Sequence, residues 1–250
     1  MRAFRILFRK ELKGFFQNPF GWIVLAFVII MQGISLSMAM KGFRTGGSNS
    51  SLVYAMCHTP LFWFYFLFIF PLITMRLFSD EEKSGTLETL LTAPVRTWQV
   101  VLSKFCAAYV FYIVLWIPSY FQLQLFSWST GLPPAWTNGG LIGTYSIALL
   151  MGAAFTAVGC LASSLTSSQI IAGITTICGL LIIYFLGFVT VIWGDGFPGA
   201  ALFRYISIQQ HLHYFASGVM DTRPVVFHLS LTAFLLFMTY QVVDYRRWKH

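Results

Sequence analysis

Between Lys104 and Asp195, ninety consecutive residues of this 250-residue chain carry no formal charge. Charged side chains make up about a quarter of an ordinary soluble domain, but only 10% of this chain, while 57% of its residues are hydrophobic. Such a composition excludes a soluble globular domain and a disordered chain. Four cysteines are also too few for a disulfide scaffold. The sequence therefore predicts a polytopic membrane protein.

Six apolar segments have the length of a membrane-spanning helix, which needs about 20 residues to cross the hydrocarbon core. Strands of a membrane barrel would instead show about ten residues of alternating polarity, a pattern that this sequence lacks. We therefore expect an all-α membrane protein, with a single transmembrane domain over the whole chain. The predicted spans are residues 20–40, 61–78, 100–128, 141–165, 170–193 and 225–243.

The basic residues predict how this bundle is oriented. Six spans place both termini on one side of the membrane, and that side would hold twelve Lys and Arg residues against four on the other. Cytoplasmic loops carry the excess of Lys and Arg in membrane proteins. Both termini are thus predicted to be cytoplasmic. The net charge of +8 then reflects topology rather than binding to nucleic acid.

Residues 2–16 have the spacing of an amphipathic helix. Arg5 and Arg9 recur on one face, and Phe8 and Leu12 recur on another. A basic helix with an apolar face lies in the membrane interface. Two roles remain open for it at this stage: an interfacial anchor that also orients the chain, or a lever that transmits motion into the first span.

The segment 79–94, between the second and third spans, holds four of the eight acidic residues. Ser79 and Glu82 have the spacing of a helix capping box, and acidic residues favour a helix N-terminus. Leucines at i, i+3 and i+4 give the segment a short apolar face, and Pro94 ends it. This pattern is typical of a cytoplasmic helix that docks on a soluble partner, and equally of an ordinary solvated loop helix.

Small side chains recur every four residues in the fourth span, at Ala148, Gly152, Thr156 and Cys160. Such a stripe lets another helix approach closely. The contact lies either within the subunit or across a dimer. In the outer segment 194–223, His211 and His213 lack further metal ligands at a standard spacing, so we expect these histidines to lie in the membrane interface rather than to bind a metal.

The sequence contains no recognisable catalytic or nucleotide-binding motif. A P-loop, a His-Glu-x-x-His pair and a Gly-x-Ser-x-Gly elbow are all absent. Residues 105–194 contain no acid or base of the kind that proton-coupled carriers keep at membrane depth. We expect no catalytic residue, cofactor or metal in this chain, so energy for any work has to come from a partner. The alternative is an intramembrane enzyme or a membrane assembly factor that needs no ATP.

The run from Thr74 to Val95 resembles the signature of ABC-2 type transporter permeases, above all in its Glu-Glu-x-x-Gly-Thr-Leu-Glu pattern at residues 81–88. Asn18-Pro19 before the first span is similar to the same family. The block Gly218–Arg223 resembles the branch that includes the gliding-motility-associated and nitrous-oxide-reductase maturation permeases.

This resemblance implies a type V exporter-like fold in a bacterial inner membrane. Two permeases, of the same or a related chain, would pair in the lipid bilayer, and each would sit on a cytoplasmic ABC ATPase that binds ATP and Mg. Residues 2–16 would form the connecting helix, with Arg5, Phe8, Arg9 and Leu12. No large outer domain is inserted, so an auxiliary periplasmic subunit would have to supply one. The implied coupling residues are Asp80, Glu81, Glu82, Gly85, Thr86, Leu87, Glu88 and Leu91.

Overall fold

The computed structural model describes residues 2–46, 52–86, 95–130, 136–194 and 199–249. Every regular element in these ranges is a helix, which confirms the predicted all-α fold for the described residues. In chain order the helices are α1 (Arg2–Gln17), α2 (Pro19–Gly46), α3 (Leu52–Cys57), α4 (Pro60–Thr74), α5 (Ser79–Lys83), α7 (Thr97–Thr130), α8 (Asn138–Ser164), α9 (Gln169–Leu186), α10 (Val189–Trp193), α11 (Ala200–Ile206), α12 (Ile208–Ala216) and α13 (Thr222–Lys249).

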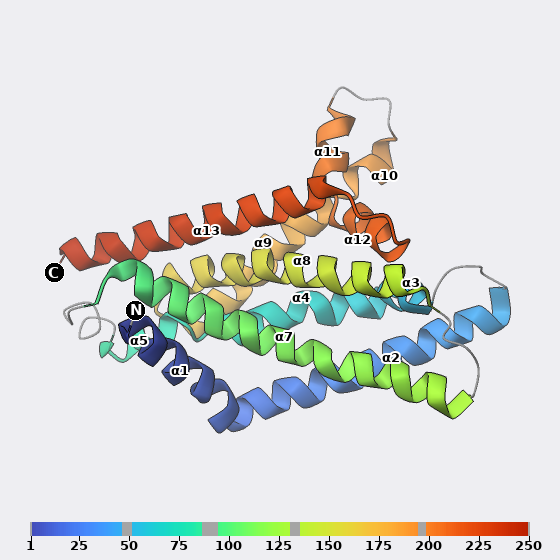
Figure 1. Cartoon of the computed structure of the whole chain (residues 1–250). Coiled ribbons are helices and arrows are strands. Elements are labelled where there is room, and N and C mark those ends of the chain that lie inside the picture. The colour runs from blue at the N-terminus through green and yellow to red at the C-terminus, as the bar shows by residue number, and fades with distance from the viewer. Residues whose placement is uncertain (1, 47–51, 87–94, 131–135, 195–198, 250) are drawn as a thin grey trace.

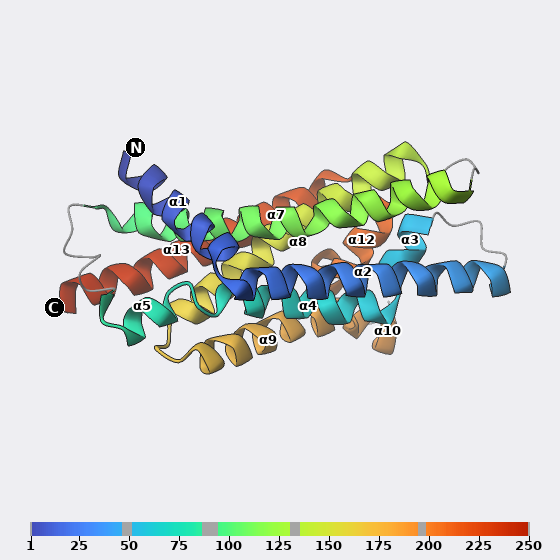
Figure 2. The ribbon, with the colours of Figure 1, turned by 90° about the horizontal axis from the view of Figure 1, so that it is seen from below.

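The long helices run side by side in one bundle (Figures 1 and 2). Six stretches of the described chain are long and apolar enough to cross a membrane, as predicted. Both termini lie at the same end of the bundle as α5, while α3 and α12 lie toward the other end. The six stretches are Pro19–Gly42, Pro60–Lys83, Thr97–Ser129, Asn138–Ser164, Gln169–Leu186 and Thr222–Arg247.

The predicted fifth span, residues 170–193, is too long. Helix α9 ends at Leu186, and α10 is a separate short helix. The last turn of α9 is tightened, since the N–H groups of Gly187 and Phe188 donate to carbonyl oxygens three residues earlier. The side-chain amide of Gln209 also donates to the carbonyl oxygen of Tyr184 at 3.3 Å. A Cβ on Gly187 would lie 2.3 Å from Gln209 Oε1 and 3.2 Å from the backbone Cα of Ser207, so the end of α9 packs closely against the segment that begins α12.

The predicted second span, residues 61–78, is not one continuous helix. Helix α4 ends at Thr74, and a turn over the next four residues leads into α5. The N-cap of α5 is Phe78, and the hydroxyl of Ser79 donates to the carbonyl oxygen of Met75. The predicted capping box between Ser79 and Glu82 is therefore wrong, because the Ser79 hydroxyl closes the preceding turn instead.

Helix α8 lies in the middle of the bundle and packs against α4, α7, α9, α12 and α13. The hydroxyl of Tyr112 on α7 donates to the carbonyl oxygen of Ala148 at 2.7 Å. A Cβ on Gly152 would lie 2.0 Å from the Tyr112 ring, so only glycine admits this close approach. Two of the small residues predicted for helix packing, Ala148 and Gly152, thus meet α7 inside the subunit. The exposed fractions along the predicted stripe are small: Ala148 2%, Thr156 0% and Cys160 0%.

Candidate functional site

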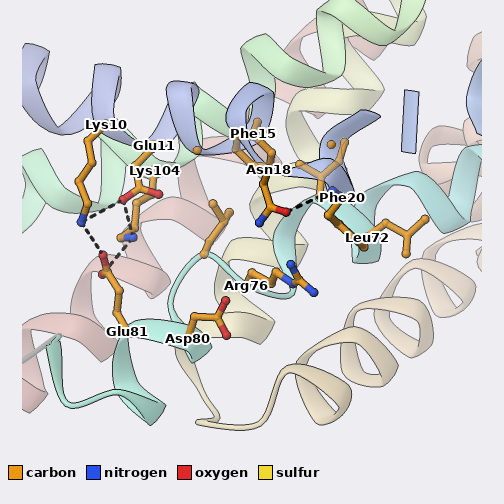
Figure 3. A pocket seen from close by; sticks show the side chains of 14 residues that line it. Lys10, Glu11, Phe15, Asn18, Phe20, Leu72, Arg76, Asp80, Glu81 and Lys104 are labelled. Atoms are coloured by element: carbon orange, nitrogen blue, oxygen red, sulfur yellow. Dashed lines mark hydrogen bonds and ion pairs between the residues drawn. The ribbon is translucent and has the colours of Figure 1, made fainter. Parts of the chain in front are cut away.

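Four charged side chains meet at the end of the bundle that carries both termini. Lys10 and Glu11 come from α1, Glu81 from α5 and Lys104 from α7 (Figure 3). Lys104 Nζ lies 3.0 Å from Glu11 Oε1 and 3.0 Å from Glu81 Oε2, and Lys10 Nζ lies 3.3 Å from Glu81 Oε1. These four residues are called the ionic cluster below. The cluster joins three helices that are far apart in the sequence.

Lys104 is the buried centre of the ionic cluster. Its side chain is only 2% exposed, and its ammonium lies 5.5 Å from the centre of the Phe78 ring. A buried ammonium costs several kcal/mol unless opposite charges compensate it. The carboxylates of Glu11 and Glu81, which are 16% and 15% exposed, provide that compensation. Pulling α1 or α5 away from α7 would therefore take one of its two carboxylate partners from a buried ammonium.

Helix α5 is also tied to the last two spans. Arg246 of α13 forms an ion pair with Glu82. The side-chain amide of Gln169, the first residue of α9, donates to the carboxylate of Asp80. Three consecutive acidic residues of this five-residue helix thus each contact a different part of the bundle. The short helix is held from several sides rather than projecting as a free loop.

A hydroxyl of α8 completes this attachment. Ser163 Oγ accepts hydrogen bonds from the backbone N–H groups of Phe78 and Ser79, at 3.1 and 3.2 Å. These N–H groups stand at the start of α5, where a helix leaves its donors unpaired. Phe78 itself is 0% exposed and anchors the helix in the core. Within the described residues, α5 is therefore linked to α1, α7, α8, α9 and α13.

The residues predicted to meet an ATPase divide into two groups. Asp80, Glu81 and Glu82 turn toward the chain's own helices, whereas residues 83–86 are exposed. Gly85 adopts a φ of 69°, and its N–H donates to the carbonyl oxygen of Glu82 at 3.1 Å. A glycine in this left-handed conformation commonly ends a helix. Leu87, Glu88 and Leu91 lie outside the described residues.

Helix α1 forms as predicted and lies along α7. Arg5 and Arg9 are exposed, while Phe8 and Leu12 are half-buried, which is the predicted division of its faces. Near its end, the ring of Phe15 stacks on Phe111 of α7 with 4.8 Å between centroids. The apolar face of α1 therefore contacts the bundle at its C-terminal end.

Sequence reasoning missed Glu11 and Lys104 as members of one site. Glu11 is the only acidic residue among the first 79, and it lies in a helix that is otherwise basic. Lys104 is a single charge at the start of an apolar segment. A lone acid in a basic helix and a lone cation beside a span indicate a buried pair. Their separation of 93 positions hides the pairing from the sequence.

At the opposite end of the bundle, His211 and His213 point to different partners. His211 Nδ1 lies 3.4 Å from His228 Nε2, whereas His213 Nδ1 lies 2.7 Å from the hydroxyl of Tyr54. Burial lowers the pKa of His211 to about 4, so this ring is neutral near pH 7. The part of the chain that the structure describes brings together no group of three metal-ligating side chains of the His, Cys, Asp and Glu types.

The fold and this site define a multi-pass, all-α membrane protein whose short helix after the second span is tied to most of the bundle. The family model described as ABC-2 family transporter protein matches residues 8–189, and the chain belongs to this family. It is therefore a permease subunit of an ABC transporter, a kind of protein that associates with an ABC ATPase. No curated protein sequence matches the chain. The narrower branch suggested by residues 218–223 stays a prediction.

Proposed function

We propose that this permease belongs to an ATP-driven exporter of a bacterial inner membrane. A second permease, the same or a related chain, pairs with it, and cytoplasmic ABC ATPases bind the ATP and Mg. Movement of the ATPases on binding and hydrolysing ATP changes the arrangement of the spans. The support comes from the family and from the attachment of α5.

The observation that carries this proposal is the ionic cluster together with the Arg246–Glu82 pair. A docking helix transmits force only if it is firmly attached to the spans. Because Lys104 is buried between carboxylates of α1 and α5, separating these helices is more costly than moving them together. A push on α5 thus displaces α1 and α7 together with it. The ion pair between Arg246 and Glu82 passes the same movement to α13.

The last residue of α5 and the three residues after it, residues 83–86, form an exposed surface that is open to an ATPase. Glu81 and Glu82 then act as links inside the permease, and the chain's own basic residues are their partners. Residues 5 and 9 of α1 provide a second exposed and basic surface at the same end of the bundle.

Reversing an exposed charge on this surface tests the proposal. Lys83→Glu is expected to lower the amount of ABC ATPase that co-purifies with the full chain about tenfold, which equals about 1.4 kcal/mol. Arg223→Glu, a change of the same kind on an exposed residue in the first turn of α13 at the other end of the bundle, is the control and keeps the ATPase. Co-purification is measured by quantitative mass spectrometry, with equal amounts of membrane-inserted permease.

Equal capture of ATPase by Lys83→Glu and the unchanged chain would contradict docking on residues 83–86. An active complex that contains no nucleotide-binding chain would contradict the ATP-driven function as a whole. That second result would favour the alternative of an ATP-independent enzyme or assembly factor.

A further inference from the structure

A cavity of about 270 Å³ lies beside the ionic cluster, between α1, α2, α4, α5 and α7 (Figure 3). Its size is near the lower end of pockets that hold small molecules, about 300–1,000 Å³. One side is apolar and is lined by Phe15, Phe20, Leu72 and Leu77. The other side carries charged groups. The cavity therefore suits a ligand with one polar and one apolar part.

Most of the charges around the cavity compensate one another. Lys10 and Lys104 pair with Glu81, and Lys104 also pairs with Glu11. Two charged groups remain, one of each sign, and both line the cavity: Arg76 and Asp80. Neither of them has an ion-pair partner within the described residues. The lining as a whole is thus neutral, with one guanidinium and one carboxylate left for a ligand.

The guanidinium of Arg76 is positioned by an aromatic ring, but one of its N–H groups has no hydrogen-bond acceptor. It lies 4.3 Å from the centre of the Phe20 ring, and its Nε is buried without a hydrogen-bond acceptor. Figure 3 shows Arg76 reaching toward Phe20 and away from Asp80. Asp80 accepts a hydrogen bond from the neutral amide of Gln169, which leaves its negative charge uncompensated.

We propose that this cavity binds the headgroup of a zwitterionic phospholipid that carries a primary ammonium. The guanidinium of Arg76 binds the phosphodiester, because its planar N–H groups match phosphate oxygens. The ammonium donates to the carboxylate of Asp80, which has unused lone pairs. The glycerol and the start of the acyl chains lie against Phe15, Phe20 and Leu72. An anionic headgroup would leave Asp80 uncompensated.

The place of the cavity favours a membrane lipid over a soluble phosphoester. It lies where α1 turns into the first span, at Asn18, which is the expected level of the lipid headgroups. Gly14 and Asn18 are exposed at its rim, so the cavity opens to the outside of the bundle. A lipid can therefore enter sideways from the membrane leaflet.

The test measures which lipid stays bound to the full chain in native mass spectrometry, after reconstitution with equal amounts of phosphatidylethanolamine, phosphatidylcholine and phosphatidylglycerol. We expect at least threefold more retained phosphatidylethanolamine than either other lipid. Arg76→Gln lowers this retention about tenfold. Gly14→Leu has the same effect by filling the cavity, since a Cβ at Gly14 meets nothing within 4 Å. Lys13→Gln, which removes an exposed cation of α1 outside the cavity, leaves retention unchanged.

Asp80→Asn separates the two halves of the proposed headgroup site. It is expected to shift retention from phosphatidylethanolamine toward phosphatidylglycerol, because the ammonium loses its partner while Arg76 still binds phosphate. Equal retention of all three lipids, or unchanged retention in Arg76→Gln, would overturn the proposal. Displacement of the lipid by soluble glycerophosphoethanolamine or inorganic phosphate at millimolar concentration would overturn it in favour of a soluble phosphoester. Co-purification of the ATPase is scored separately, so failure of the lipid site does not count against the exporter.

Discussion

At the scale of single residues, Lys104 is the most consequential side chain of this protein. Counted from the sequence, it is one of the basic residues that orient the chain. In the structure it lies two turns inside α7, 2% exposed, between carboxylates from α1 and α5. A lysine that the sequence suggests is a solvent-exposed charge next to a span is therefore buried inside the protein. The charge is kept because two carboxylates at 3.0 Å offset its desolvation.

Lys104→Met is therefore expected to lower the free energy of unfolding by about 3–5 kcal/mol, because two largely buried carboxylates lose the cation between them and keep only the exposed Lys10. Adding Glu11→Gln and Glu81→Gln recovers part of the loss, since the buried negative charges are then removed as well. Lys13→Met, on the exposed face of α1, is the control and changes little. Chemical unfolding in detergent measures all three. A loss of under about 1 kcal/mol for Lys104→Met would show that the cluster is not buried.

At the scale of elements, the junction of α1 and α2 sets the angle between the two helices. The side chain of Asn18 accepts from the backbone N–H of Phe20 at 3.2 Å, and the indole of Trp22 donates to the carbonyl oxygen of Phe16 at 2.8 Å. A Cβ on Gly21 would lie 1.9 Å from the carbonyl oxygen of Phe15. The turn is possible only because position 21 lacks a side chain.

Two glycines of this region offer a matched comparison. Gly21→Ala is expected to force α1 away from α2 and to lower the free energy of unfolding by about 2–3 kcal/mol, in the upper range of single substitutions. Gly14→Ala meets nothing within 4 Å and lies inside α1, so it is expected to stabilise by about 0.5–1 kcal/mol through helix propensity. Thermal unfolding compares the two. A neutral Gly21→Ala would mean that the junction relaxes without loss.

At the scale of the whole molecule, the structure agrees with the arrangement that the charges predict. Both termini and α5 lie at one end of the bundle, and α3 and α12 lie toward the other (Figures 1 and 2). If the basic end is cytoplasmic, the ionic cluster lies on the side where an ATPase would bind. The proposed function therefore requires that the end of the bundle with both termini and α5 faces the cytoplasm.

Cysteine labelling with a membrane-impermeant maleimide tests this orientation. In intact cells Arg223→Cys is expected to react, whereas Lys83→Cys reacts only after the membrane is permeabilised. The unchanged chain, with its four free cysteines, supplies the background. Labelling of Lys83→Cys in intact cells would reverse the predicted topology and remove α5 from the cytoplasm.

Local chemistry made much of the fold predictable. Apolar length places the spans, and the amphipathic spacing of residues 2–16 predicts α1 correctly, because each of these features depends on residues a few positions apart. The two errors have different origins. At the end of α9, Tyr184 meets Gln209 from 25 positions away, a contact that no local pattern reveals. Ser79 lies within one turn of Met75, and its hydroxyl bonds back to that carbonyl oxygen instead of capping a helix.

The sequence by itself determined that this chain spans a membrane six times, which end is basic, and that four of its eight acids follow the second span. Those properties follow from composition and short-range spacing alone. Only the tertiary structure decided what the acids do. Packing brings Lys104 next to Glu81 and next to Glu11, which is 93 positions away in the sequence. A buried cation needs carboxylates beside it, and these come from the helices that pack around it. The acidic segment thus became a link between helices, which no spacing within the segment could reveal.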